Sequence, residues 1–169
     1  MTLPITMRAM VTMGHGDLDR MVLHTDWPRP DPAEGDVLIR VGACGLNNTD
    51  VNTRSGWYSK TVTEATTGGA FEKVGENDPT WGGAPITFPR IQGADVCGEI
   101  VAVGTGVDPS RIGERVITDG WLRDTADPDD MNKTGYFGSE RDGGFAEYTT
   151  TPARNALAVT SDLSDAELA

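Results

Sequence analysis

The chain of 169 residues lacks long hydrophobic runs and a recognisable export signal. No apolar run approaches the ~20 residues that a membrane-spanning helix needs. The N-terminal Met1-Thr2-Leu3-Pro4 also lacks the charged and apolar regions of a signal peptide. We therefore expect a cytoplasmic protein with no membrane partner. Only two cysteines are present, Cys44 and Cys97, and without secretion we expect them to be reduced.

Basic residues and histidines are also scarce. The 26 acidic residues outnumber the 14 basic ones, which gives a formal net charge of -12. A surface of this sign repels phosphate backbones, so nucleic acid is excluded as a partner. His15 and His24 are the only histidines, and neither has another donor at metal-ligand spacing. We expect both to lie in turns or at the surface.

The residues that are present predict a mainly β fold in one domain. The 21 glycines and 10 prolines favour turns and short strands. Strand-like patterns occupy residues 7–13, 17–24, 36–41, 91–103, 115–117 and 145–151. Residues 121–141 are acidic and predict a loop. Many short strands separated by glycine-containing turns predict a partly open barrel with one or two small helices.

The stretch from Val41 to Tyr58 changes character in its middle. Alternating apolar residues up to Val41 predict a strand with one buried face. Asparagines, threonines, an aspartate and an arginine then follow, with Thr49 placed to cap a short helix that Gly56 would end. Such a polar elbow is typical of ligand sites. It is equally consistent with a strand-to-turn junction in which the polar groups satisfy their own backbone.

The elbow also carries a family motif. The pattern Gly-Leu-Asn-x-x-Asp-x-x-x-Arg-x-Gly-x-Tyr fits Gly45, Leu46, Asn47, Asp50, Arg54, Gly56 and Tyr58. Further motifs follow the same order as in that family: residues 30–41, 93–104, 113–116 and 143–148. Together they resemble the N-terminal, chaperonin-10-like (GroES-like) catalytic domain of the medium-chain dehydrogenase/reductases. Within this alcohol dehydrogenase superfamily, the pattern is most similar to the zinc-independent quinone oxidoreductases.

This resemblance implies a fold and a domain organisation. Residues 1–160 would form the GroES-like barrel, with residues 59–90 as an inserted loop. That loop could be a substrate-side lid, an oligomer contact or a tolerated surface insertion. Residues 161–169 would start a helix that leads to a nucleotide-binding Rossmann domain outside this chain. The capping-box pattern from Ser164 to Glu167 agrees with a helix start.

The resemblance also predicts that no zinc is bound. The positions that hold the catalytic metal in zinc alcohol dehydrogenases of this superfamily are Asn47 and Ala94 here, and Asp95 takes the position of a glutamate. An amide and a methyl group cannot replace a thiolate and an imidazole on zinc. The four closely spaced cysteines of a structural zinc site would fall between Val116 and Gly143, where there are none.

The roles implied for the site residues follow from the same family. Asn47 and Tyr58 are the predicted catalytic residues, and Asn47, Asp50 and Arg54 the predicted cofactor contacts. Asp95 would not contact the ligand itself but would orient the residues that surround those contacts. The alternatives are a local salt bridge between Asp50 and Arg54, and a carboxylate at Asp95 that merely stabilises a turn. The cofactor would be NADPH, held mainly by the absent domain, so this chain alone would be inactive.

The sequence therefore predicts the substrate-side domain of an NADPH-dependent oxidoreductase. The full-length enzyme, expected to be a homodimer, would transfer hydride to a quinone or an α,β-unsaturated carbonyl, both small-molecule substrates. One alternative is a zinc-type alcohol dehydrogenase with atypical ligands. Another is a noncatalytic co-chaperonin-like module, because the barrel is shared.

Overall fold

The computed structural model describes residues 2–58 and 86–169. Most of the predicted insertion, residues 59–85, lies outside the described residues, so its suggested roles stay predictions. The strands are β1 (Thr6–Thr12), β2 (Met21–Pro28), β3 (Asp36–Cys44), β4 (Arg90–Ile91), β5 (Val96–Val103), β6 (Arg115–Thr118), β7 (Trp121–Leu122), β8 (Gly135–Tyr136), β9 (Tyr148–Pro152) and β10 (Ala156–Ala158). The α-helices are α1 (Asn48–Ser55) and α2 (Asp165–Leu168). The 3₁₀ turns are η1 (Leu18–Arg20), η3 (Pro109–Arg111), η4 (Met131–Lys133) and η5 (Ala153–Asn155).

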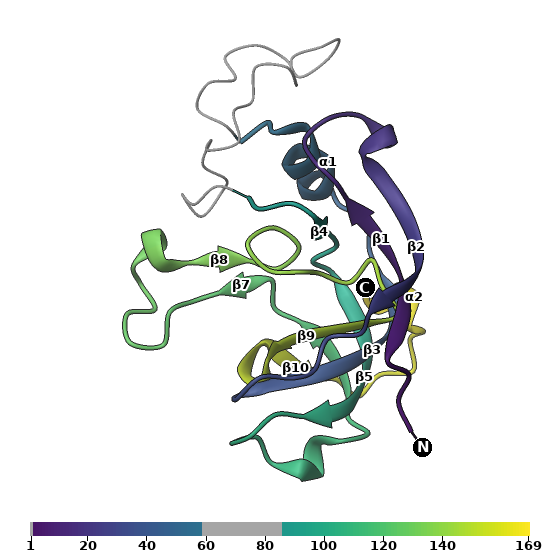
Figure 1. The fold of residues 1–169 in the computed structure, drawn as a ribbon. Helices are drawn as coiled ribbons and strands as arrows, with labels where there is room; N and C mark the ends of the chain where they lie inside the picture. Colours follow the sequence, from purple (N-terminus) through teal and green to yellow (C-terminus); the bar gives the residue numbers. More distant parts are fainter. Residues whose placement is uncertain (1, 59–85) are drawn as a thin grey trace.

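Five strands form the main antiparallel sheet, in the order β10-β6-β5-β3-β9 (Figure 1). β2, β1 and β4 form a second sheet, and β7 with β8 forms a small hairpin that projects away from the others. This mainly β arrangement with few short helices confirms the predicted fold class. The predicted loop over residues 121–141 was partly wrong, because cross-strand pairing of Trp121 with Tyr136 creates the β7–β8 hairpin. Its two-residue strands are too short to show a sequence period.

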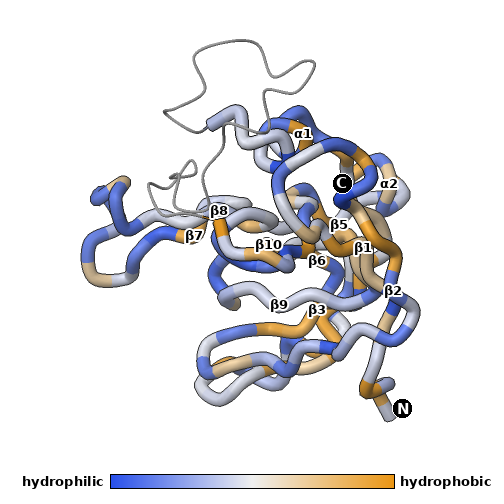
Figure 2. The backbone as a smooth tube through the Cα atoms, turned by 45° about the horizontal axis from the view of Figure 1, so that its top comes forward, coloured by the Kyte–Doolittle hydropathy of each residue, from blue (hydrophilic) through white to orange (hydrophobic). Residues whose placement is uncertain are grey.

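The core consists of two apolar clusters, one built on the main sheet and one on the second sheet. Its main cluster contains fully buried side chains from β3 and β5, among them Val37, Ile39 and Ile100, with Phe137 beside them. A second cluster joins β1 and β4 through Val11 and Ile91. Figure 2 shows hydrophobic stretches along these central strands and hydrophilic ones along the outer loops. The first half of β3 is buried on both faces, because Val37, Leu38 and Ile39 are all fully buried, so the expectation of a single buried face was wrong there.

The pairing of β3 with β5 positions the elbow. Cys44, the last residue of β3, pairs with Val96, the first residue of β5. Beyond this pair the chain leaves β3 into the elbow, while residues 92–95 lead into β5. At Gly98 the two strands approach so closely that a Cβ atom would lie 2.3 Å from the carbonyl oxygen of Arg40. The antiparallel register therefore brings residues near 47 beside residues near 95.

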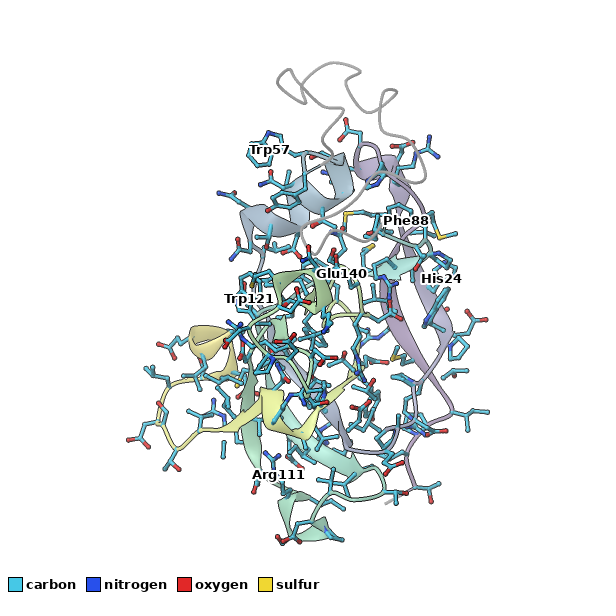
Figure 3. All side chains as sticks on the ribbon, turned by 90° about the vertical axis from the view of Figure 1, so that its left-hand side faces the viewer. His24, Trp57, Phe88, Arg111, Trp121 and Glu140 are labelled. Carbon is cyan, nitrogen blue, oxygen red and sulfur yellow. The ribbon has the colours of Figure 1, made fainter. Side chains whose placement is uncertain are left out.

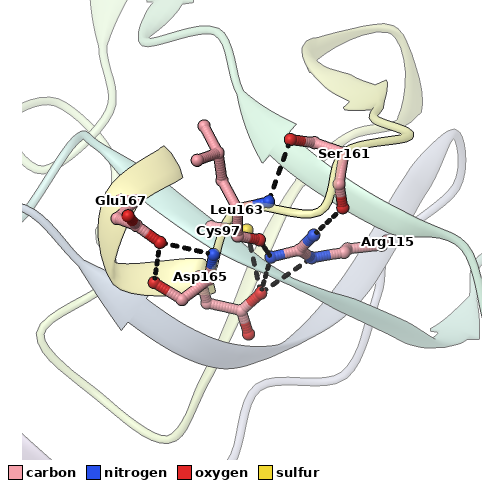
Figure 4. A network of polar contacts seen from close by, with 7 residues as sticks. Cys97, Arg115, Ser161, Leu163, Asp165 and Glu167 are labelled. Carbon is pink, nitrogen blue, oxygen red and sulfur yellow. Dashed lines mark hydrogen bonds and ion pairs between the residues drawn. The ribbon is translucent and has the colours of Figure 1, made fainter.

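A polar network attaches α2 to the main sheet (Figure 4). The Arg115 guanidinium contacts the Asp165 carboxylate at 2.6 Å and donates to the carbonyl oxygens of Ser161 and Leu163. Asp165 also accepts a 3.4 Å hydrogen bond from the Cys97 thiol. The Glu167 carboxylate accepts from the backbone N–H and hydroxyl of Ser164, as the predicted capping box requires.

His15 lies in the bend between β1 and β2, as expected, whereas His24 is half-buried within β2, so the expectation of a turn or surface position was wrong for His24. His15 Nδ1 lies 3.1 Å from the Thr53 carbonyl oxygen, and His24 packs edge-on against Trp27 with ring centroids 4.9 Å apart. Cys44 and Cys97 are free, as expected. No helix among the described residues is long and apolar enough to cross a membrane.

Candidate active site

The elbow begins with a capping box built on Asn47. The Asn47 side-chain oxygen accepts from the Thr49 N–H at 3.2 Å, and the Asp50 carboxylate accepts from the Asn47 N–H at 2.9 Å. Asn47, rather than the predicted Thr49, is therefore the N-cap of α1. The N-cap residue stands just before the helix, where its side chain can accept from backbone N–H groups of the first turn that have no partner within the helix. Thr49 already lies within that first turn, so it supplies one of these N–H groups. Gly56 ends the helix in the left-handed conformation at φ 69°, as predicted.

Asp50 ties the elbow to the segment before β5. Its second carboxylate oxygen accepts from the Gly93 N–H at 3.0 Å, and its carbonyl accepts from the Gln92 side chain at 2.9 Å. Burial raises the pKa of the Asp50 carboxyl, and the hydrogen bonds from Asn47 and Gly93 oppose that shift. Gly93 has φ 96°, and a Cβ there would lie 2.6 Å from the Cys44 sulfur. Only glycine fits this junction.

Asn47 and Asp95 meet at the mouth of the elbow. The Asn47 Nδ2 donates to the Asp95 carboxylate at 3.1 Å. An amide nitrogen carries two hydrogens, so one remains for a ligand after this bond is made. Asn47 is exposed and Asp95 half-buried, which places that hydrogen at the protein surface. The arrangement can orient a hydrogen-bond donor toward a bound oxygen.

Arg54 and Tyr58 lie in different environments, the first buried against the β1–β2 turn and the second beside a cavity. Arg54 is buried, donates to the Gly16 carbonyl and lies 3.8 Å from an Asp17 oxygen. The polar neighbours of Arg54 thus belong to the β1–β2 turn. The Asp50 contacts described above go instead to backbone groups and the Gln92 side chain, and not to Arg54. Tyr58 accepts a 3.4 Å hydrogen bond from Asn52 and lines a cavity beside α1. Arg54 fixes the elbow to the second sheet, and Tyr58 lines the cavity beside α1.

That cavity of about 80 Å³ lies between α1 and the β7–β8 hairpin. Its lining residues are Thr49, Thr53, Tyr58, Trp121, Tyr136 and Ser139. The Trp121 and Tyr136 rings meet edge-on with centroids 5.6 Å apart. In Figure 3, Trp121 and Trp57 lie on the same side of the molecule. Among the described residues of the wall, three are aromatic and three carry aliphatic hydroxyl groups, a mixture of apolar and polar groups that suits a small molecule.

Two hydroxyl groups of this cavity are buried without a hydrogen-bond partner. They belong to Thr49 and Ser139, and Ser139 is only 2% exposed. A buried hydroxyl without a partner costs stability, so such groups often serve a bound molecule. Burial, followed by the nearby charges of Asp95 and Asp50, raises the pKa of the Tyr136 phenol. These two carboxylates are therefore close enough to influence the cavity electrostatically.

Comparison with known proteins identifies the family to which this fold and this elbow belong. Residues 33–161 match the family described as "Alcohol dehydrogenase GroES-like domain". The chain belongs to this family. This GroES-like domain is 33% identical over 171 residues to the protein named "Probable alcohol dehydrogenase AdhA" from Mycobacterium tuberculosis (strain CDC 1551 / Oshkosh), covering 93% of this chain and 41% of that one.

Two solved structures show similar folds. One, from Sinorhizobium meliloti 1021, is provisionally described as an alcohol dehydrogenase; it has 46% identity and a TM-score of 0.80, and covers 98% of this chain and 43% of that chain. The other is a cobalt- and zinc-bound thermostable alcohol dehydrogenase from Pyrobaculum aerophilum, with 26% identity, a TM-score of 0.66, and coverage of 90% and 41%. The GroES-like domain thus spans about two fifths of the chains that it matches.

The side chains of this GroES-like domain do not fit a zinc ion at the elbow. Asn47 offers an amide and Ala94 a methyl group, and the Asp50 carboxylate is already used by the N–H groups of Asn47 and Gly93. Among the described residues, no three His, Cys, Asp or Glu side chains gather as a metal-binding group. Burial, assisted by Asp50 and Asp95, raises the pKa of the Cys44 thiol to about 12. Cys44 is therefore a neutral thiol near neutral pH.

The structure brings together Asn47, Asp50 and Asp95, which the sequence had selected. It adds two residues that sequence reasoning missed as site residues, Thr49 and Ser139. Thr49 was considered only as a helix cap. Ser139 lies in the stretch that was interpreted as a loop, and nothing in its sequence surroundings distinguishes it from an ordinary turn serine.

Proposed function

We propose that this chain is the substrate-side domain of a longer oxidoreductase that transfers hydride between a nicotinamide cofactor and a small carbonyl compound without zinc. The quinone and α,β-unsaturated carbonyl classes are the proposed substrates, and NADPH the proposed cofactor. The Asn47–Asp95 hydrogen bond beside an aromatic cavity is the observation that supports this most directly. Family membership and similarity to alcohol dehydrogenases support the reaction class.

Asn47 is proposed to donate its remaining amide hydrogen to the substrate oxygen. Hydride transfer to a carbonyl or an enone leaves negative charge on that oxygen, and a fixed N–H donor stabilises the charge as it develops. Asp95 holds the amide in the required orientation. When bound, the nicotinamide supplies the hydride, and the cavity wall of Trp121 and Tyr136 positions the substrate.

Tyr58 is proposed to supply the proton that the reduced substrate takes up, and Thr49 to hydrogen-bond to the oxygen that receives it. Both line the cavity, and the Thr49 hydroxyl is buried without a partner. The Tyr58 phenol can give its proton to the developing alkoxide or enolate and regain one from solvent, while the Thr49 hydroxyl donates a hydrogen bond to the same oxygen. Asp50 and Arg54 are proposed to act indirectly, by holding the elbow against the Gly93 backbone and the β1–β2 turn.

The test measures turnover of a quinone, an enone and a simple alcohol by the complete polypeptide, with NADPH and NADH, and zinc content on the same sample. Asn47→Ser keeps an N-cap side chain but removes the amide donor, so we expect about a hundredfold lower turnover with an unchanged fold. Asn48→Ala changes an exposed neighbour and serves as the matched control. Equal loss in both variants contradicts the proposed donor role.

A zinc-type alcohol dehydrogenase is the second candidate, because the Pyrobaculum aerophilum relative binds zinc and cobalt. It predicts about one zinc ion per chain at the elbow and loss of alcohol oxidation with a chelator. Activity that survives chelation and still depends on Asn47 supports the zinc-independent reaction. Activity that follows the zinc content favours this second candidate.

A further inference from the structure

A second cavity, of about 240 Å³, shares no lining residue with the one beside α1. Its walls come from β1, the end of β2, β4, residues 140–143 and β9. We propose that this second cavity binds a small neutral molecule in which a carboxamide group is attached to an aromatic or apolar body. The proposal does not depend on hydride transfer.

The apolar wall of the second cavity suits a flat ring. Trp27 and Tyr148 line it together with Met7 and two prolines. Met7 is 2% exposed, and both aromatic side chains pack against the apolar cluster that contains it. This wall is held in place by the second sheet. Rigid aromatic surfaces of this kind bury planar ligands at low entropic cost.

The polar wall of the second cavity contains two enclosed groups without hydrogen-bond partners: Arg90 Nε and the Thr149 hydroxyl. The other Arg90 nitrogens are used, since one donates to Asp142 at 3.0 Å and one to the Thr87 hydroxyl at 2.9 Å. Thr149 is 2% exposed. A ligand that reaches these two groups recovers hydrogen bonds that the protein leaves unmade.

The charges on this wall favour a neutral ligand over an anion. Arg90 is paired with Asp142, and Arg141 contacts both Asp36 and the Thr150 hydroxyl. Glu140 adds another carboxylate to the lining. An anion would meet guanidinium groups that are already neutralised, close to carboxylates that repel it.

A carboxamide matches both unpartnered groups. Its carbonyl oxygen can accept from Arg90 Nε–H, and its N–H can donate to the Thr149 hydroxyl oxygen. A carboxylate could accept from both Arg90 Nε–H and the Thr149 hydroxyl, so the charge that the wall disfavours is what separates it from a carboxamide. The simplest matched pair of probes is therefore benzamide and benzoate, which have the same shape and differ in charge.

The experiment is an NMR titration of the complete polypeptide with each probe, following the Arg90 Nε–H resonance. Loss of that resonance in Arg90→Lys assigns it. We expect benzamide to shift it to saturation and to bind at least tenfold more tightly than benzoate. In Thr149→Val, benzamide binding should weaken about five- to tenfold, because one hydrogen bond is lost.

Thr151→Val is the matched control. Thr151 lies on the same strand as Thr149, is fully buried, and has an unpartnered hydroxyl, yet it does not line the second cavity. Its substitution should leave benzamide affinity unchanged. The proposal is overturned if neither probe shifts the Arg90 resonance, which would mean a cavity that holds only water. The proposal is also overturned if benzoate binds as tightly as benzamide. It is overturned, too, if Thr149→Val and Thr151→Val bind benzamide with equal affinity.

Discussion

The side-chain amide of Asn47 donates a hydrogen bond to the carboxylate of Asp95, 48 positions away in the chain, at 3.1 Å. The amide oxygen of the same side chain caps α1 through the Thr49 N–H. Asn47 is thus held at both ends, and its orientation is set before any ligand arrives. Preorganised donors of this kind are the ones that stabilise developing charge well.

Asp95→Ala should lower turnover about tenfold, because the amide of Asn47 loses the acceptor that orients it. Asp95→Asn retains a carbonyl oxygen at this position and should restore most of the rate. Steady-state kinetics on both variants should show the change in kcat more than in KM. A loss of the same size in Asp95→Asn would point to the charge of Asp95 instead of its orienting hydrogen bond.

Thr49→Val should separate stability from activity. The variant removes a buried hydroxyl that has no partner, so the free energy of unfolding should stay the same or rise by about 1 kcal/mol. If the hydroxyl donates a hydrogen bond to the reacting oxygen, turnover should fall about tenfold, and Thr49→Ser should recover it. Urea denaturation and turnover on the same preparations check both parts. Full activity in Thr49→Val would exclude this hydrogen-bonding role.

Gly98→Ala should destabilise the fold by about 1–3 kcal/mol, because the added methyl group meets the Arg40 carbonyl at 2.3 Å between β3 and β5. Gly14→Ala is the control. A Cβ at Gly14 has no heavy atom within 4 Å, so the change should stay within about 0.5 kcal/mol. Thermal and urea unfolding measure both variants. Similar stability in the two would mean that β3 and β5 separate at little cost.

Cys44 should resist alkylation in the folded protein, because its pKa of about 12 leaves almost no thiolate at pH 8. We expect iodoacetamide to label it at least about a hundredfold more slowly than in urea, as read by mass spectrometry. Rapid labelling of folded Cys44 at pH 8 would contradict the burial that raises its pKa.

The same shift makes stability depend on alkaline pH. The pKa of the Cys44 thiol in the folded protein lies above its ordinary value of 9.0, so the contribution of the neutral thiol to stability is complete below pH 9 and is lost as the pH rises towards 12. Cys44→Ala should therefore flatten the fall in stability over this range. An unchanged slope in Cys44→Ala would assign the fall to other groups.

Much of the local structure could be predicted from short-range patterns. The run of β-branched and apolar residues identified β3, although its first half is buried on both faces, and Gly56 identified the end of α1 because it tolerates the left-handed conformation. The absence of thiolate and imidazole donors at Asn47 and Ala94 is likewise a property of the sequence alone. Local chemistry determined these features, so no tertiary contact was needed to recognise them.

The tertiary structure decided which residues share a site. Antiparallel pairing of Cys44 with Val96 fixes the register that brings Asn47 to Asp95 and the Asp50 carboxylate to Gly93. Thr49 and Ser139 line one cavity although 90 positions separate them, because the β7–β8 hairpin folds beside α1. Register and hairpin packing depend on contacts between distant segments, and no sequence period encodes such contacts. For that reason the sequence determined the elbow, and only the fold determined what the elbow faces.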